Sequence, residues 1–197
     1  MKRWISNPTA VFLLGILSGC ASSFQGNQLA SVSGYPTVQH KKTIFVDLAF
    51  SGKLNGEPWT QNDAANQSYL KQRCLGHLES SGMFSFVSGE LKSTDLQLYI
   101  AIINEKETSP AKQTVSALTL FLVPYRATDS FRLMAVLKDP SSGKKVDIAL
   151  KAGVNHRQQL FLGLLAPFKT PGSEIEKCTD RILENLCMEI HRTGLVE

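Results

Sequence analysis

The segment Asp95–Asn104 reads DLQLYIAIIN and contains the clearest strand pattern in the chain. Successive side chains of a strand point to opposite faces of its sheet. One face of this segment carries Leu96, Leu98, Ile100 and Ile102, and the other carries Gln97, Tyr99, Ala101 and Ile103. The first face is wholly aliphatic, so it needs a second layer of structure to cover it. The segment therefore predicts a long strand in a sheet that other elements cover.

Five other segments have the composition of strands. The first, Thr43–Phe50 (TIFVDLAF), alternates in the same way and precedes a loop of turn-forming residues, 51–61. The remaining four segments are 84–88, 114–124, 131–138 and 145–151. The turn residues of Asp139–Gly143 predict that the last two strands form a hairpin. The charged segment 105–112 is predicted to be a hairpin loop.

Two segments predict amphipathic helices. One begins at Asn62 or Asp63 and ends near Ser80. Its apolar stripe consists of Leu70, Cys74 and Leu78. The other begins at the capping box Ser173–Glu176 and ends at Gly194. Both helices have an apolar side that suits the face of a sheet.

The order of these segments is β-α-β-β-β-β-β-α. Because each helix has one apolar side, both are predicted to pack on the same sheet. We therefore expect an α+β fold with a single curved, mainly antiparallel sheet covered on one face by the two amphipathic helices.

The first 20 residues have the features of a bacterial lipoprotein leader. Lys2 and Arg3 form a positive start, and Ala10–Leu17 is an apolar run of eight residues, too short to span a bilayer. Leu17-Ser18-Gly19-Cys20 resembles a lipobox, which implies cleavage between Gly19 and Cys20 and attachment of lipid to the Cys20 sulfur. The alternative is a secreted protein with a chance cysteine at its cleavage site.

The leader divides the chain into three parts. Residues 1–19 are predicted to be the signal peptide, 20–42 a lipidated flexible tether rich in polar and small residues, and 43–197 one periplasmic domain. An Asp after the cysteine would resemble an inner-membrane retention signal. Ala21 stands there instead and favours the periplasmic face of the outer membrane.

Three cysteines remain for the domain: Cys74, Cys178 and Cys187. The periplasm is oxidising and permits a disulfide. Cys178 and Cys187 lie on one predicted helix and point to opposite sides of it, so they cannot bridge each other. A disulfide would join Cys74 to Cys178 or to Cys187. The alternative is that all three are small buried apolar residues.

Residues that could perform chemistry are scattered along the chain. His40 lies in the tether, His77 on the surface of a helix, His156 in a polar loop at 155–159 and His191 in the last helical turn. None has the spacing of a metal site, and no nucleophile elbow or phosphate-binding loop is present. The basic residues form no stripe for nucleic acid. We therefore expect a protein that is not an enzyme and has no metal or cofactor.

Two apolar features have two interpretations each. Trp59, on the loop after the first strand, either contacts a partner or folds back over the edge of the core. The apolar segment Leu160–Phe168 (LFLGLLAPF) is either a surface for a partner or a lipid, with Leu160 and Phe161 exposed, or a connector packed under the last helix.

From residue 43 to about 193 the chain resembles small outer-membrane lipoproteins whose domains look like the amino-terminal domain of the translocation protein TolB. The resemblance rests on the lipobox, the order of elements, Leu120–Pro124 (LFLVP) and Ala166–Phe168 (APF). Lipoproteins of this kind assist the export of lipopolysaccharide, curli or exopolysaccharide. The resemblance implies binding or assembly without catalysis, and it transfers a residue role to Cys20 alone.

Two functions compete on this evidence, with an enzyme third. The first is an adaptor that is bound to the membrane by its lipid and joins an envelope protein in an export or cell-wall complex, alone or as a homo-oligomer. The second is a periplasmic carrier of a lipid or another apolar ligand, with Leu160–Phe168 lining a cleft between helices and sheet.

Overall fold

The structure is a computed structural model of the chain, and it describes residues 22–24, 29–119, 122–158 and 171–196. Seven strands form one sheet in the order β1-β7-β6-β5-β2-β3, and β4 pairs with β2 beside that path. The strands are β1 Ser22–Phe24, β2 Thr43–Leu54, β3 Glu57–Pro58, β4 Phe86–Ser88, β5 Leu96–Glu107, β6 Tyr125–Lys138 and β7 Lys145–Gln158. The helices of the described residues are α2 Asp63–Ser80, α3 Pro110–Leu118 and α4 Pro171–Arg192.

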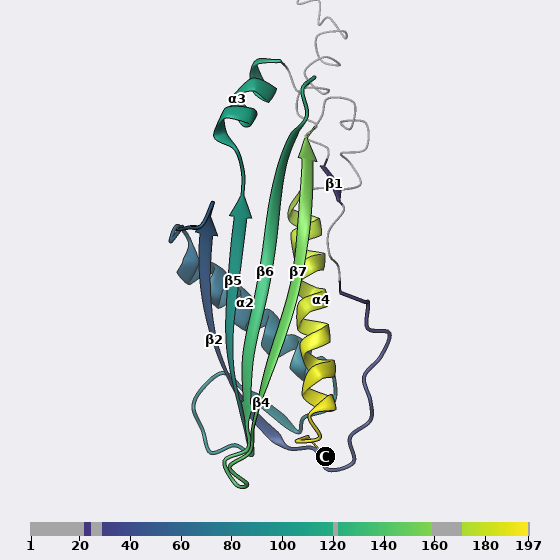
Figure 1. Cartoon of the computed structure of the whole chain (residues 1–197). Helices are drawn as coiled ribbons and strands as arrows, with labels where there is room; N and C mark the ends of the chain where they lie inside the picture. Colours follow the sequence, from purple (N-terminus) through teal and green to yellow (C-terminus); the bar gives the residue numbers. More distant parts are fainter. Residues whose placement is uncertain (1–21, 25–28, 120–121, 159–170, 197) are drawn as a thin grey trace, which may run out of the picture.

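Four long strands make up most of the sheet (Figure 1). β5 lies between β2, to which it is parallel, and β6, to which it is antiparallel. β6 and β7 form an antiparallel hairpin along their whole length. β2 and β5 can run parallel because α2 lies between them in the chain and provides the crossover connection. The sheet is mixed, with most neighbouring pairs antiparallel.

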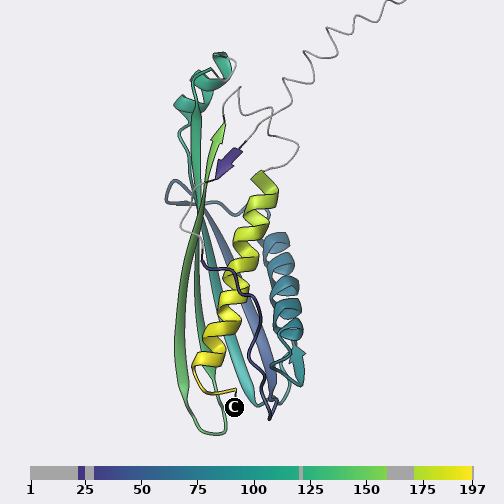
Figure 2. The same cartoon turned by 90° about the vertical axis from the view of Figure 1, so that its right-hand side faces the viewer.

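The two long helices lie on the same side of the sheet, and no described helix covers the other side (Figure 2). This arrangement confirms the predicted α+β fold and its two covering helices. The helices also contact each other: the Asp180 carboxylate of α4 accepts a hydrogen bond from Arg73 Nε of α2 at 3.1 Å and lies 3.1 Å from His77 Nε2. His77 is therefore half-buried between the helices, and its prediction as a surface residue was wrong.

The core forms between the helices and the sheet face that they cover. It includes the four aliphatic residues of the Asp95–Asn104 pattern, which are at most 4% exposed. Its largest fully buried side chains are Ile44, Leu48, Leu78, Met83, Leu96, Leu98, Leu133, Leu137, Ile182, Leu183, Leu186 and Ile190. They come from β2, β5, β6 and the two long helices, except Met83, which lies in the connection between α2 and β4. The hydrophobic effect on this one face accounts for the pairing of the two layers.

The segment 114–124 was predicted to be a strand, and this prediction was wrong. Its first five residues, 114–118, belong to α3, which begins at Pro110. Ser109 is the N-cap, and its hydroxyl accepts a hydrogen bond from the Lys112 backbone N at 3.4 Å. Proline suits the first position of a helix because the missing N–H has no partner there. This helix start lies inside the segment 105–112 that was predicted as a hairpin loop, and β5 extends to Glu107.

β6 and β7 are both longer than their sequence patterns predicted. β6 begins at Tyr125, and β7 continues to Gln158 through the segment predicted as a polar loop. Each strand satisfies the backbone hydrogen bonds of the other, so polar side chains do not end the pairing. The predicted turn between them is confirmed: the Asp139 carboxylate accepts from the Ser141 hydroxyl at 2.6 Å, and Gly143 has φ +70°.

Residues 29–42 were assigned to the tether, and part of this segment packs on the domain. Val38 is 4% exposed in the core cluster, and Leu29 and Tyr35 pack against the same cluster. Asn185 Nδ2 on α4 donates to the Ala30 carbonyl at 2.8 Å. These contacts place the segment against the domain and alongside its last helix.

None of the helices that the structure describes has the length and apolar run needed to cross a bilayer.

The two faces of β6 generate a stability prediction. Leu133→Ala removes a fully buried side chain between sheet and helices, and we expect it to lower the free energy of unfolding by about 2–5 kcal/mol. Met134→Ala changes the next residue, which is 49% exposed on the uncovered face, and should cost about 0.5 kcal/mol or less. Urea denaturation followed by circular dichroism measures both. Similar losses in the two variants would contradict this assignment of the faces.

Candidate interaction surface

The uncovered face of the sheet contains a shallow apolar hollow of about 560 Å³, which we call the open-face hollow. Its floor is a row of paired residues that crosses four strands: Ala49, Ala101, Met134 and Ala149. Alanine side chains are short, so the surface is depressed where three of them lie near one another. Met134 is 49% exposed within this row. The open face is toward the viewer in Figure 1.

The next row along the same face combines apolar and acidic residues. It consists of Asp47, Tyr99, Val136 and Asp147, one from each strand. Strands lie about 4.8 Å apart, so the two aspartates stand about 14 Å from each other at opposite ends of the row. Neither aspartate forms an ion pair within the described part of the chain. The hollow is thus apolar in the middle and negative at both sides.

Tyr99 is held in place at the centre of that row. Its ring packs edge-on against Phe45, with 6.0 Å between the ring centroids, and Lys138 Nζ lies 4.7 Å from its centroid. The Tyr99 hydroxyl donates to Gln97 Oε1 at 3.2 Å. These contacts restrict the ring, so the hollow has a preformed shape, which lowers the entropy cost of binding.

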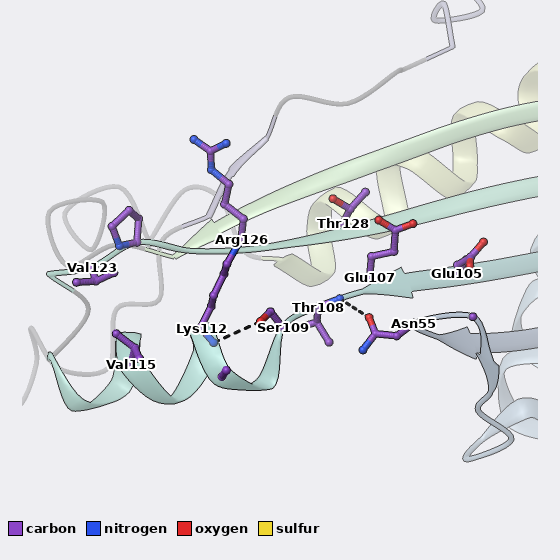
Figure 3. Close-up of a pocket in the computed structure, with 13 residues that line it drawn as sticks. Asn55, Glu105, Glu107, Thr108, Ser109, Lys112, Val115, Val123, Arg126 and Thr128 are labelled. Atoms are coloured by element: carbon purple, nitrogen blue, oxygen red, sulfur yellow. Dashed lines mark hydrogen bonds between the residues drawn. The ribbon is translucent and has the colours of Figure 1, made fainter.

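A second cavity of about 1050 Å³ lies at the end of the sheet where β5 leads into α3, and we call it the tip cavity (Figure 3). Val115 and Val123 line one end of it, and Glu105 and Glu107 line the other. Asn55 Oδ1 accepts from the Thr108 backbone N at 2.8 Å and fixes the junction of β5 and α3. This cavity is open and mixes charged with apolar groups.

A third and smaller cavity of about 310 Å³, the inner cavity, lies between the sheet and the beginning of α4. Trp59, Tyr125 and Ile175 contribute apolar or aromatic groups to its wall. The cavity also reaches the buried pair of Asp129 and His156, whose Oδ2 and Nε2 atoms are 2.7 Å apart. Burial and the nearby Asp129 raise the pKa of the Tyr125 hydroxyl.

The Asp129–His156 pair is a feature that the sequence analysis missed. His156 was predicted in a loop, but it lies on β7 and is 7% exposed. Asp129 on β6 pairs with Val154 on β7, two residues before His156. Because side chains alternate along each strand, Asp129 and His156 both point to the covered face, toward α4. A buried polar group is costly unless it has a partner, so the pair satisfies two groups that the long hairpin buries. The sequence signal for it was weak, because Asp and His lie 27 positions apart.

The remaining histidines and acids that the structure describes form no cluster suited to a metal ion. His40 is exposed and His77 contacts Asp180. Asp95 accepts hydrogen bonds from the backbone N and the hydroxyl of Thr43, and these bonds lower the pKa of its carboxyl group. Among the residues that the structure describes, no group of three His, Cys, Asp or Glu side chains could hold a metal ion.

The three described cysteines have free, buried thiols in this structure. Burial raises the pKa of Cys178 to about 11 and that of Cys187 to about 12, and burial with the nearby Cys187 raises the pKa of Cys74 still further. Thiols of this kind are poor nucleophiles. Both predicted pairings, Cys74 with Cys178 and Cys74 with Cys187, remain open. The disulfide itself stays a prediction.

The other predicted site residues have different outcomes. Trp59 folds back along β2, where its backbone N donates to the Gly52 carbonyl at 2.9 Å, and it remains 39% exposed. It lines the inner cavity, and its role as a partner contact stays a prediction. The predicted cleavage residues Gly19 and Cys20 and the predicted contact residues Leu160 and Phe161 lie outside the described residues.

Comparisons with known proteins find similarity in three-dimensional structure alone. No protein-family model matches the chain, and no curated protein matches its sequence. A dodecamer of a PelC variant from Paraburkholderia phytofirmans is 12% identical, with a TM-score of 0.39 over 83% of this chain and 95% of that one. A minor lipoprotein from Acinetobacter baumannii is 14% identical, with a TM-score of 0.42 over 80% and 91%.

A third similar structure is a protein from Helicobacter pylori described as a neuraminyllactose-binding hemagglutinin homolog. It is 12% identical, with a TM-score of 0.44 over 84% of this chain and 90% of that one. At these TM-scores the similarity does not assign the chain to a family. Its function must be inferred from its own residues.

The buried pair generates a second stability prediction. Asp129→Ala leaves His156 buried without its carboxylate, and we expect a loss of about 3 kcal/mol in the free energy of unfolding. The control is Glu105→Ala, which removes the partner of the more exposed Arg132 on the open face and should cost about 1 kcal/mol or less. Urea denaturation compares the two variants. Equal losses would show that the buried pair contributes no more than a surface contact.

Proposed function

We propose that the chain is a lipoprotein, anchored through Cys20 at the periplasmic face of the outer membrane, whose domain is a non-catalytic adaptor for an envelope protein. The observation that carries the proposal is the open-face hollow. Its apolar floor and its two flanking carboxylates lie on a surface that no described helix covers. Such a combination is typical of a site for another protein, because exposed apolar area rimmed by charge favours association.

The chemistry of the hollow defines the partner that it fits. Short or medium apolar side chains of the partner would enter the depression between Ala49, Ala101 and Ala149. Lysine or arginine side chains on both sides of that apolar group would reach Asp47 and Asp147, about 14 Å apart. We therefore propose a partner segment with an apolar centre and basic residues on both sides. A second copy of this chain is the homo-oligomeric version of the same hypothesis.

The anchor supports this function by placing the domain at the membrane. The acyl chains on Cys20 give durable binding, because each buried methylene adds about 0.8 kcal/mol. The paired strands β1 and β7 then keep the sheet close to that anchor. An adaptor of this kind needs a fixed position and an accessible face, and it needs no reactive group.

Photocrosslinking in cells tests the adaptor proposal. A benzoyl-phenylalanine at Met134, in the open-face hollow, should capture an envelope protein that mass spectrometry identifies. The matched control is the same group at Tyr69, which is 44% exposed on α2 in the helix layer, and it should not capture that protein.

The charge requirement provides the second arm of this experiment. The pair of changes Asp47→Lys and Asp147→Lys should reduce capture at Met134 at least several-fold, since it repels a basic partner segment. Capture of this chain alone at Met134 assigns the hollow to self-assembly. Equal capture at both positions, or capture that the two charge reversals leave unchanged, would contradict the proposal.

The inner cavity favours a second candidate function, a carrier of an apolar ligand. It lies between α4 and the sheet, where such a ligand was expected, and Trp59, Tyr125 and Ile175 provide apolar surface. A carrier would retain lipid in this cavity in a fixed ratio. Ile175→Trp fills the cavity, so it should remove non-covalent lipid that solvent extraction and mass spectrometry find in the unmodified protein. The same lipid content in both proteins would count against the carrier.

A further inference from the structure

Four exposed aliphatic residues gather at the end of the sheet that carries α3, and we call them the tip patch. They are Val115, Leu118, Leu122 and Val123, with 47%, 80%, 58% and 44% of their surface exposed. Single exposed apolar residues are common on proteins, whereas a cluster of large ones marks an interaction site. Leu118 is the most exposed large hydrophobic residue of the described chain.

Hydrogen bonds hold these four residues in one place. The Leu122 backbone N donates to the Thr119 carbonyl at 3.0 Å, and the Ser116 hydroxyl donates to the Val123 carbonyl at 2.7 Å. Leu122 and Val123 thereby lie against the last turn of α3. Ser116 is also the one buried residue of α3, so the helix contributes no buried apolar side chain to the core. Its apolar residues are available to something outside the domain.

The register of β1 places the predicted lipid anchor at this same end of the molecule. Ser22 pairs with Gln158, and Gln158 pairs with Tyr125 on β6, so these three residues lie in one row. β1 is antiparallel to β7, so its first residue, Ser22, lies beside Gln158, the last residue of β7. β6 runs in the same direction as β1, so the residues before Tyr125, among them Val123, lie beyond the same row. Figure 1 shows β1 and α3 at the same end of the sheet.

The distance between anchor and patch is limited by covalent geometry. Cys20 precedes Ser22 by two residues, and two residues span at most about 7 Å. A lipid on the Cys20 sulfur must therefore enter the membrane near the row that contains Tyr125. Val123 of the tip patch precedes Tyr125 in that row by two positions, with Pro124 between them. Any membrane that holds the lipid lies next to the patch.

The charges around the patch suit a phospholipid surface. Lys112 and Arg126 are exposed and line the tip cavity. They lie between the patch residues Val115 and Val123 at one end of the cavity and Glu105 and Glu107 at the other (Figure 3). Cations that flank an apolar patch can contact anionic headgroups while the patch enters the acyl region. The carboxylates lie farther from the patch, on the side of the sheet.

We infer that the tip patch inserts into the membrane leaflet that holds the lipid on Cys20, with Lys112 and Arg126 at the phosphate groups of its phospholipids. The inference rests on the proposed anchorage through Cys20. Acyl chains hold a protein at the surface but leave it free to tilt. A second apolar contact beside them fixes the long axis of the sheet and leaves the open-face hollow accessible from the periplasm.

Fluorescence quenching by brominated phospholipids tests this insertion. The full-length protein, processed in cells and carrying Trp59→Phe to remove background, receives Leu118→Trp as reporter. It is reconstituted into vesicles of phosphatidylethanolamine and phosphatidylglycerol with bromine on the acyl chains. Bromine quenches tryptophan on contact, so we expect at least a several-fold greater loss of fluorescence than for Met134→Trp. The control position is also exposed and apolar, but it lies on the open face.

The intact mass of the purified protein separates the two proposals. If the protein is acylated but the reporter at position 118 is quenched no more than the control, the insertion is overturned and the anchor is retained. Protein that is not acylated overturns the anchor. In that case quenching of the Leu118→Trp reporter on added vesicles would still support insertion of the patch. Leu122→Asp, which adds charge to the patch, should reduce quenching at position 118, and unchanged quenching would argue against insertion.

Discussion

The pairing of β6 with β7 over 14 residues is the constraint on which the rest of the structure depends. Every backbone N–H and C=O of a buried strand needs a partner, and this hairpin provides partners far beyond the apolar part of each strand. Its middle builds the core with Leu133 and Ala135. Its far end holds Asp129 against His156 and offers an edge to β1. The length of this hairpin sets the position of the tip patch and, in our proposal, that of the lipid anchor.

The two faces of the sheet have different chemistry because their neighbours differ. The covered face is almost wholly aliphatic, and α2 and α4 supply the matching apolar sides together with buried cysteines. The open face repeats alanine across three strands and adds aspartate at both ends of the next row. Such a face is too polar to be the core of a second layer within this chain, and too apolar in its middle to be an ordinary solvated surface. This contrast is the physical basis of our proposal that the protein is an adaptor that binds through its sheet.

The anchor and the tip patch together would give the domain a defined orientation. A lipid alone provides affinity for a membrane, whereas a second contact near the lipid provides direction. In the proposed arrangement the end of the sheet that carries α3 contacts the membrane, and the open-face hollow faces sideways into the periplasm. The inner cavity, near the same end, would lie close to the bilayer, which is also where a carrier would exchange an apolar ligand.

The sequence by itself determined the elements whose patterns are local. The alternation in 43–50, 95–104, 131–138 and 145–151 and the stripe of Leu70, Cys74 and Leu78 depend on neighbours two to four residues away. The structure has a strand or helix at each of these places, although β6 and β7 extend beyond the predicted bounds. The signal for the start of α3 was also local, in the pair Ser109 and Pro110. The strand-like composition of 114–124 nevertheless led to the prediction of a strand.

Tertiary structure alone decided the register, and with it the candidate sites. The row of Ala49, Ala101, Met134 and Ala149 arises from four strands spread over 100 residues, and no local pattern marks it. No local pattern marks the contact of Asp129 with His156 or the pairing of Ser22–Phe24 with the end of β7 either. Register depends on the sum of backbone pairing and core packing over the whole sheet, so a residue's neighbours across the strands become known only when the entire sheet is assembled.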